Sequence, residues 1–275
     1  MWIGELLPER SDIIMTLFKN KGIRDTRKKK MRISLPKWLK VPERTSMPPK
    51  SDKLKQENKM VGQENKYFRL MLEEIDTLQD IDDRRFAYHL LSNLPDYFFS
   101  APASSSGKYH PSNDLGNGGL VRHSISVVRM LEHLLEPDGY SDFTDEQKEL
   151  LKIAALFHDC MKSGTQEEYE KDKRTKFLHP LYAANFIMTT AINNGYPYEK
   201  ALFIYNAVIS HMGQWNTKGD VILPTPKTPD QKILHLADYL ASRRDINMVL
   251  GEEYFDDKVD DESTITTDEK EKESV

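Results

Sequence analysis

The spacing of hydrophobic and polar positions predicts two helices at the start of the regular part of the chain. Apolar side chains recur there at intervals of three and four residues: Tyr67, Leu70, Met71, Ile75, Leu78, Phe86, Leu90 and Leu91. Such intervals put side chains on one face of an α-helix. Because Pro95 follows the last of them, the second helix is predicted to end before that residue.

Five more helices are predicted from the same periodicity. Their approximate ranges are 120–135, 144–162, 180–194, 197–211 and 231–247. Thr144 and Gln147 have the spacing of a capping box, and Gly195 has the position of a helix end. Residues 96–119 are rich in turn formers and are predicted to be a connection. The charged residues 165–176 are predicted to be a solvated surface segment, with a short exposed helix or a lid as the alternatives. No segment predicts a strand, an internal repeat or a Gly-rich phosphate loop, so the predicted fold is all-α.

A nearly unbroken apolar run carries the strongest candidate chemistry. Residues 150–162 read LLKIAALFHDCMK, which predicts a buried helix that ends in His158, Asp159 and Lys162. Neighbouring helix positions diverge by about 100°, so His158 and Asp159 point apart, whereas His158 and Lys162 share a face. A carboxylate can bridge two cations, whereas an imidazole supplies one nitrogen to one cation. The segment therefore predicts a metal site with two metals, or with one metal and a bridging group.

Composition adds a compartment to this picture. With 38% hydrophobic and 30% charged residues, the chain is expected to fold around one core with polar extensions. No span approaches the ~20 apolar residues of a membrane helix, and the first residues lack a basic region followed by an apolar one. The single cysteine, Cys160, excludes an intrachain disulfide and is predicted to be a small buried residue. We therefore expect a cytoplasmic protein without a membrane partner.

Charge divides the chain into three parts. The net charge is −5, but residues 1–60 carry +9 and residues 251–275 carry −8. Residues 1–63 are predicted to be a basic, proline-containing, flexible extension, residues 64–250 the folded domain, and residues 251–275 an acidic disordered tail. Trp38 lies among basic residues, and such a segment can contact nucleic acid through phosphates and base stacking. A solvated extension without a partner is the alternative.

Further residues of metal-binding type occur near the ends of predicted helices or on apolar faces. Together with the central pair they are His123, His158, Asp159, His179, His211 and Asp238. Asp238 lies between apolar neighbours and needs a partner. Arg243 and Arg244 are candidates, either as its structural partners or as phosphate clamps. His110, in the turn-rich connection, either reaches the site from there or is a solvated loop histidine.

In the order H, HD, H, H, D, these residues resemble the HD-domain metal-dependent phosphohydrolase superfamily over about 109–244. The local sequences GGLVRHS, LFHDCMK and LADYLASRR match as well. The resemblance implies a helical bundle around a central metal, held by His123, His158, Asp159 and Asp238. It also implies that Asp159 bridges to a second metal on His179 and His211, as in two-metal phosphodiesterases. The cations would be divalent, two per chain, with Mn, Mg, Fe, Ni and Co not distinguished.

The resemblance also assigns roles in catalysis. Asp159 and Lys162 would be catalytic, and Lys162 would contact substrate phosphate together with His110, Arg243 and Arg244. The loop histidine followed by GGL and a further histidine is most similar to the HD domain of bacterial 3′-to-5′ exoribonucleases, which carry an OB-fold where this chain has a basic extension. The expected function is hydrolysis of a phosphoester in a nucleotide or in single-stranded nucleic acid through a metal-activated water.

Two other functions remain open from the sequence. Some HD-like proteins resemble this ligand set but hold two irons and oxidise C–H bonds with dioxygen, and histidine-rich sites accept iron. Iron content and oxygen uptake would identify that class. A non-catalytic nucleic-acid-binding protein with a structural metal is the third hypothesis. Its binding would weaken steeply with salt and persist in Asp159→Ala.

Overall fold

The computed structural model describes residues 65–104, 107, 110–136, 142–246 and 248–251, which lie in one compact unit. The predicted basic extension, including Trp38, lies outside the described residues, as does the predicted acidic tail beyond residue 251. Among the described residues, no helix is both long enough and apolar enough to cross a membrane.

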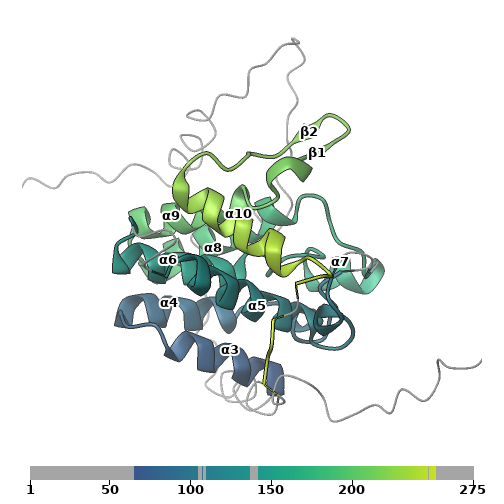
Figure 1. The fold of residues 1–275 in the computed structure, drawn as a ribbon, viewed down its shortest axis with the longest axis horizontal. Coiled ribbons are helices and arrows are strands. Elements are labelled where there is room, and N and C mark those ends of the chain that lie inside the picture. Colours follow the sequence, from purple (N-terminus) through teal and green to yellow (C-terminus); the bar gives the residue numbers. More distant parts are fainter. Residues whose placement is uncertain (1–64, 105–106, 108–109, 137–141, 247, 252–275) are drawn as a thin grey trace, which may run out of the picture. The chain divides into compact units, whose positions relative to one another are not determined.

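Helices make up nearly all of the regular structure in the described part of the chain, as predicted (Figure 1). The α-helices are α3 (Lys66–Asp76), α4 (Ile81–Leu91), α5 (Gly119–Leu134), α6 (Asp145–Phe157), α7 (Gln166–Lys171), α8 (His179–Asn194), α9 (Tyr198–Ile209) and α10 (Pro229–Ala241). Short 3-10 turns are η2 (Asp96–Phe99), η3 (Ser112–Asp114) and η4 (Gly213–Trp215). The all-α prediction is confirmed.

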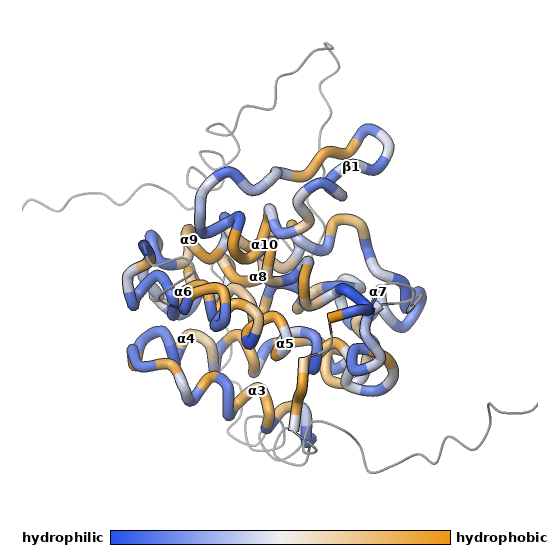
Figure 2. Tube along the Cα trace, in the orientation of Figure 1, coloured by the Kyte–Doolittle hydropathy of each residue, from blue (hydrophilic) through white to orange (hydrophobic). Residues whose placement is uncertain are grey.

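The helices α5 and α6 pack together at the centre of the bundle. Helices α3 and α4 pack against each other and cover one side of this pair, and α9 and α10 cover the other, with α8 against both α9 and α4 (Figure 1). Apolar and polar residues alternate along the helical tubes, as expected of helices with one buried face (Figure 2). One continuous apolar core results, and most residues of α5 and α6 are buried.

Several helix ends lie where the capping box, proline and glycine signals in the sequence predicted them. Thr144 and Gln147 form the predicted capping box, with both reciprocal hydrogen bonds at the start of α6. Helix α8 begins at His179, with Pro180 in its first turn, and ends at Gly195 with a left-handed backbone, φ 69°. The charged segment after residue 164 contains the six-residue helix α7.

The central helix is shorter than predicted. It ends at Phe157, and tight turns follow in which the N–H groups of Cys160, Lys162 and Gly164 each donate to the carbonyl three residues earlier. The reason is local: Nδ1 of His158 donates to the Ala155 carbonyl, at 2.8 Å, which a continuing helix would have bonded to the N–H of residue 159. His158 and Lys162 therefore do not share a helix face, contrary to the prediction.

Two further predictions about regular elements were wrong. Helix α10 ends at Ala241, not near residue 247, because Arg243 Nε donates to the Tyr239 carbonyl at 3.2 Å in place of its own backbone N–H. A two-stranded antiparallel hairpin, β1 (Thr217–Lys218) with β2 (Val221–Ile222), occurs where no strand was predicted. Its strands are two residues long, too short to show an alternating pattern.

Candidate metal centre

The ends of five helices bring the predicted ligands together inside the core. His123 lies in the second turn of α5, His158 and Asp159 follow α6, His179 starts α8, His211 follows α9, and Asp238 lies in the last turn of α10. All are buried except Asp238, which is partly exposed. Their nitrogen and oxygen atoms fall into overlapping groups whose members lie within 4.8 Å of one another.

These ligand atoms form two neighbouring sets that share Asp159. In the first set, His123 Nε2 lies 3.1 Å from Asp238 Oδ1 and 3.9 Å from Asp159 Oδ2. His158 Nε2 belongs to the same set, 3.6 Å from the Asp238 oxygen and 3.4 Å from the Asp159 oxygen. One oxygen of Asp159 and two imidazoles therefore surround one position together with Asp238.

The second set uses the other oxygen of Asp159. Its Oδ1 lies 3.1 Å from His179 Nε2 and 3.7 Å from His211 Nε2, and these two nitrogens are 3.2 Å apart. A carboxylate whose two oxygens face two separate imidazole pairs has the geometry of a bridging ligand. The two sets also overlap, because His211 has a ligand atom within 4.8 Å of those of His158 and Asp238.

The hydrogen bonds on the outer side of each imidazole fix which nitrogen faces the centre. Nδ1 of His158, His179 and His211 each lies 2.7–2.8 Å from the carbonyl oxygen three residues earlier. A carbonyl only accepts, so each Nδ1 carries the proton and, in a neutral ring, each Nε2 presents a lone pair. This is the tautomer that ligates a metal through Nε2.

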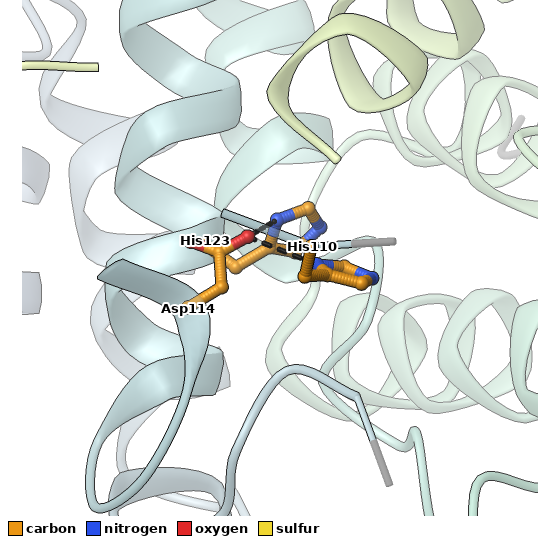
Figure 3. Close-up of side chains that lie close together, drawn as sticks. All are labelled: His110, Asp114 and His123. Atoms are coloured by element: carbon orange, nitrogen blue, oxygen red, sulfur yellow. Dashed lines mark hydrogen bonds and ion pairs between the residues drawn. The ribbon is translucent and has the colours of Figure 1, made fainter. Parts of the chain in front are cut away.

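The remaining histidine of the first set is oriented by a carboxylate that sequence reasoning missed. Asp114, fully buried in η3, lies with its Oδ2 3.1 Å from Nδ1 of His123 and 2.9 Å from Nδ1 of His110 (Figure 3). Metal-binding histidines commonly donate their outer N–H to such a carboxylate. A search of the turn-rich loop for an acidic residue would have found Asp114, although the loop contains no periodicity that singles it out.

The GGL sequence and Arg122 hold this loop against α5. Arg122 is buried and donates to the carbonyls of Leu115 and Asn117, at 2.7 and 2.8 Å, and so ties down the loop beside Asp114. At Gly119, an added Cβ would lie 2.1 Å from the backbone oxygen of Asp114. The glycine therefore permits the close approach that brings Asp114 to His123.

The electrostatics of the centre favour added positive charge. Burial alone would raise the pKa of Asp159, but Lys162 and His158 outweigh it and hold this pKa well below its usual range. Burial lowers the pKa of His158, yet Asp159 and Asp238 outweigh that effect and raise it to about 10. Burial and neighbouring His158 instead lower the pKa of His211 to about 3, which keeps that ring neutral.

The same atoms show that the residues fit divalent cations. Within the described part of the chain, His158 Nε2 and Asp159 Oδ1 are buried without a hydrogen-bond donor or acceptor to satisfy them. Unsatisfied buried polar atoms are costly, and the facing Nε2 lone pairs of His179 and His211 would repel each other. A cation in each set would relieve both costs. Imidazole and carboxylate ligands suit Zn, Mn, Fe, Co and Ni.

The predicted substrate-binding residues are distributed around the centre. Lys162 contacts Asp159 Oδ2 and is largely buried, and Tyr97 anchors the same turn by donating to the Gly164 carbonyl at 2.8 Å. His110 does reach the site, through Asp114. Within the described residues, neither Arg243 nor Arg244 pairs with Asp238, whose partners are His123 and His158. The prediction of an arginine partner for Asp238 was therefore wrong.

Comparison with known proteins adds a family to this geometry. Residues 120–243 match the family model described as HD domain, a span that starts after the GG sequence and ends at Arg243. All six predicted ligands lie within it. No curated protein and no solved structure matches the chain.

Proposed function

Residues 120–243 of the chain belong to the HD-domain family, and from this premise we propose that the protein hydrolyses a phosphoester of a nucleotide or of single-stranded nucleic acid. The HD domain implies a metal-dependent phosphohydrolase. The observation that carries the proposal is Asp159, whose two oxygens face two separate pairs of histidines inside a buried centre.

The residues have separate roles in this proposal. His123, His158, Asp159 and Asp238 would hold one divalent cation, and Asp159, His179 and His211 a second. Bound there, two such cations would lower the pKa of a water for attack on phosphorus and would stabilise charge on the phosphoryl oxygens. Lys162 lies beside Asp159, and its Nζ would donate to a phosphoryl oxygen, since the side chain is long and flexible. His110 would contact substrate from the loop, held in place by Asp114.

Hydrolysis assays test the proposal. Metal-loaded protein would be assayed with Mn²⁺ against cyclic nucleotides, cyclic dinucleotides, nucleoside triphosphates, labelled single-stranded RNA and bis-p-nitrophenyl phosphate. We expect turnover of at least one substrate that falls by two orders of magnitude or more in Asp159→Ala. No turnover from protein shown to contain two metals per chain would contradict the phosphohydrolase and leave oxygen uptake by an iron-loaded centre as the next assay.

We further propose the cytoplasm as the compartment. Its support is the only cysteine, Cys160, a fully buried free thiol whose pKa is raised by burial. Fractionation of the cells that make the protein tests this, and recovery from an oxidising extracellular fraction would contradict it.

A further inference from the structure

A compact cluster of two aromatic rings and one cation lies at the end of α10. The rings of Trp215 and Tyr239 are stacked, with centroids 5.5 Å apart and planes 17° from parallel. The guanidinium carbon of Arg243 lies 4.4 Å from the Tyr239 centroid and 5.9 Å from that of Trp215. Because the three separations are similar, Arg243 lies beside the stacked pair and not beyond Tyr239 at the far end of the stack.

The cluster is fixed directly to the segments that carry the metal ligands. Tyr239 follows the ligand Asp238, and Trp215 lies four residues after the ligand His211. His235 connects the two segments, since its Nδ1 donates to the His211 carbonyl at 2.7 Å and its ring lies 6.3 Å from that of Trp215. The cluster is therefore tied through the backbone to the two segments that supply His211 and Asp238.

The cluster keeps binding capacity that the fold does not use. Trp215 is 45% exposed although Tyr239 stacks on its ring, so much of the indole surface faces solvent. Arg243 donates to the Tyr239 carbonyl and to Ser242 Oγ, which uses two of its five donors. A half-exposed indole ring beside a guanidinium suits a flat ring that carries a phosphate.

We propose that Trp215, Tyr239 and Arg243 form a platform on which a base of the nucleotide or single-stranded nucleic-acid substrate stacks, with Arg243 contacting an adjoining phosphate. The platform rests on the proposed function, because it supplies the base-binding half of a site whose metal centre cleaves the phosphoester. Every base has a π face, so stacking on this platform tolerates all four bases. The protein is therefore expected to require a base and to discriminate little between bases.

Ligand binding in the metal-loaded full chain tests the platform without depending on turnover. Calorimetry would compare AMP and CMP with ribose 5-phosphate, which has the sugar and phosphate but no base. We expect both nucleotides to bind about tenfold or more tightly than ribose 5-phosphate, and within about threefold of each other, the size expected of one base–aromatic stack. Trp215→Ala should remove that difference and leave ribose 5-phosphate binding unchanged, whereas Trp215→Phe should retain most of it.

A matched control distinguishes the loss of base stacking from a general effect of removing an exposed aromatic side chain. Tyr198 is 39% exposed at the start of α9, roughly 18 Å along that helix from the end that precedes His211. Tyr198→Ala should leave all three affinities unchanged. Equal binding of AMP and ribose 5-phosphate by the wild type, including no measurable binding of either, would overturn the platform, as would an equal loss of both in Trp215→Ala. Base-dependent binding without hydrolysis of any phosphoester would overturn the proposed function and leave the platform standing.

Discussion

At the scale of single residues, the orientation of each histidine matters as much as its identity. Three of the ligand histidines donate Nδ1–H to a backbone carbonyl, and His123 alone uses a carboxylate, that of Asp114. Burial would raise the pKa of Asp114, but His123 and His110 outweigh it and hold this pKa below its usual range, so the carboxylate is charged. Its charge makes His123 a more basic ligand.

We expect Asp114→Asn to weaken metal binding while leaving the helices intact. The amide keeps the size of the side chain but removes the charge that orients and polarises His123, and losses of this kind cost about 10- to 100-fold in metal affinity. Titration of Mn²⁺ against a competing chelator measures the change, with circular dichroism as the folding check. Asp145→Asn, at a fully exposed carboxylate on α6, is the matched control. Equal affinity in Asp114→Asn and wild type would show that Asp114 does not support the centre.

Sequence reasoning found the ligands more readily than their supports. His158 and Asp159 could be predicted as ligands because two polar residues directly follow an apolar helical segment. Arg122 acts by donating to carbonyls of a turn-rich loop, and Asp114 acts from that loop on His123, so no periodic pattern marks either contact. The position of Arg243 could not be predicted from the sequence, because α10 ends at Ala241 and not near residue 247. That end is set by the side-chain hydrogen bond from Arg243 Nε to the Tyr239 carbonyl.

At the scale of elements, the candidate metal centre is formed where helices begin or end. A histidine near the end of a helix can donate Nδ1–H to the carbonyl three residues earlier, as His158 and His211 do. This hydrogen bond replaces the one that would continue the helix, and it also orients Nε2 toward the centre. Periodicity alone predicts that such a helix continues. This explains why α6 was predicted too long although its start, set by the local capping box, was predicted correctly.

A buried ion pair between α4 and α9 gives the fold a pH dependence that can be measured. Asp83 is fully buried and accepts from Tyr196 Oη at 2.6 Å and from Lys200 Nζ at 3.0 Å. Burial raises the pKa of Asp83 by more than Tyr196 and Lys200 lower it. Because the folded state binds the proton more tightly, the contribution of Asp83 to stability is fully present in acid and is lost as pH rises through its folded-state pKa.

We therefore expect the thermal midpoint of wild type, relative to that of Asp83→Asn, to be higher near pH 4 than at pH 7. Asparagine does not titrate, and every other titrating group is common to both proteins, so the difference isolates Asp83. Calorimetric scans of the two proteins across this range measure it. A difference that is constant, or that grows toward pH 7, would show that the pKa of Asp83 is not raised in the folded protein.

At the scale of the whole molecule, the basic extension has two alternative roles, contact with nucleic acid or none beyond solvation. Residues 1–60 carry a net +9, and a segment of this charge can contact nucleic-acid phosphates. If it does, the following changes are expected. Simultaneous replacement of Lys28, Lys29 and Lys30 by Gln should weaken single-stranded RNA binding. It should also reduce the slope of log affinity against log salt by up to about 2, at about 0.7 for each phosphate that a lysine no longer neutralises.

Fluorescence anisotropy across a salt series measures that slope. Replacement of Lys270 and Lys272 by Gln, in the acidic tail, removes positive charge where no RNA binding is predicted and is the control. An unchanged slope in the Lys28–Lys30 variant would favour the alternative of a solvated extension. Neither outcome bears on the centre between the helices, because the lysines lie outside the HD domain.

The proposed metal-dependent phosphohydrolase depends on the two ligand sets that share Asp159. Its most direct test follows hydrolysis of the best substrate from the assay panel as Mn²⁺ is returned to metal-stripped protein. We predict no hydrolysis without metal and a maximum near about two ions per chain, with His211→Ala binding one ion fewer and losing most activity. Full hydrolysis by the stripped protein, or none with two ions bound, would contradict the account.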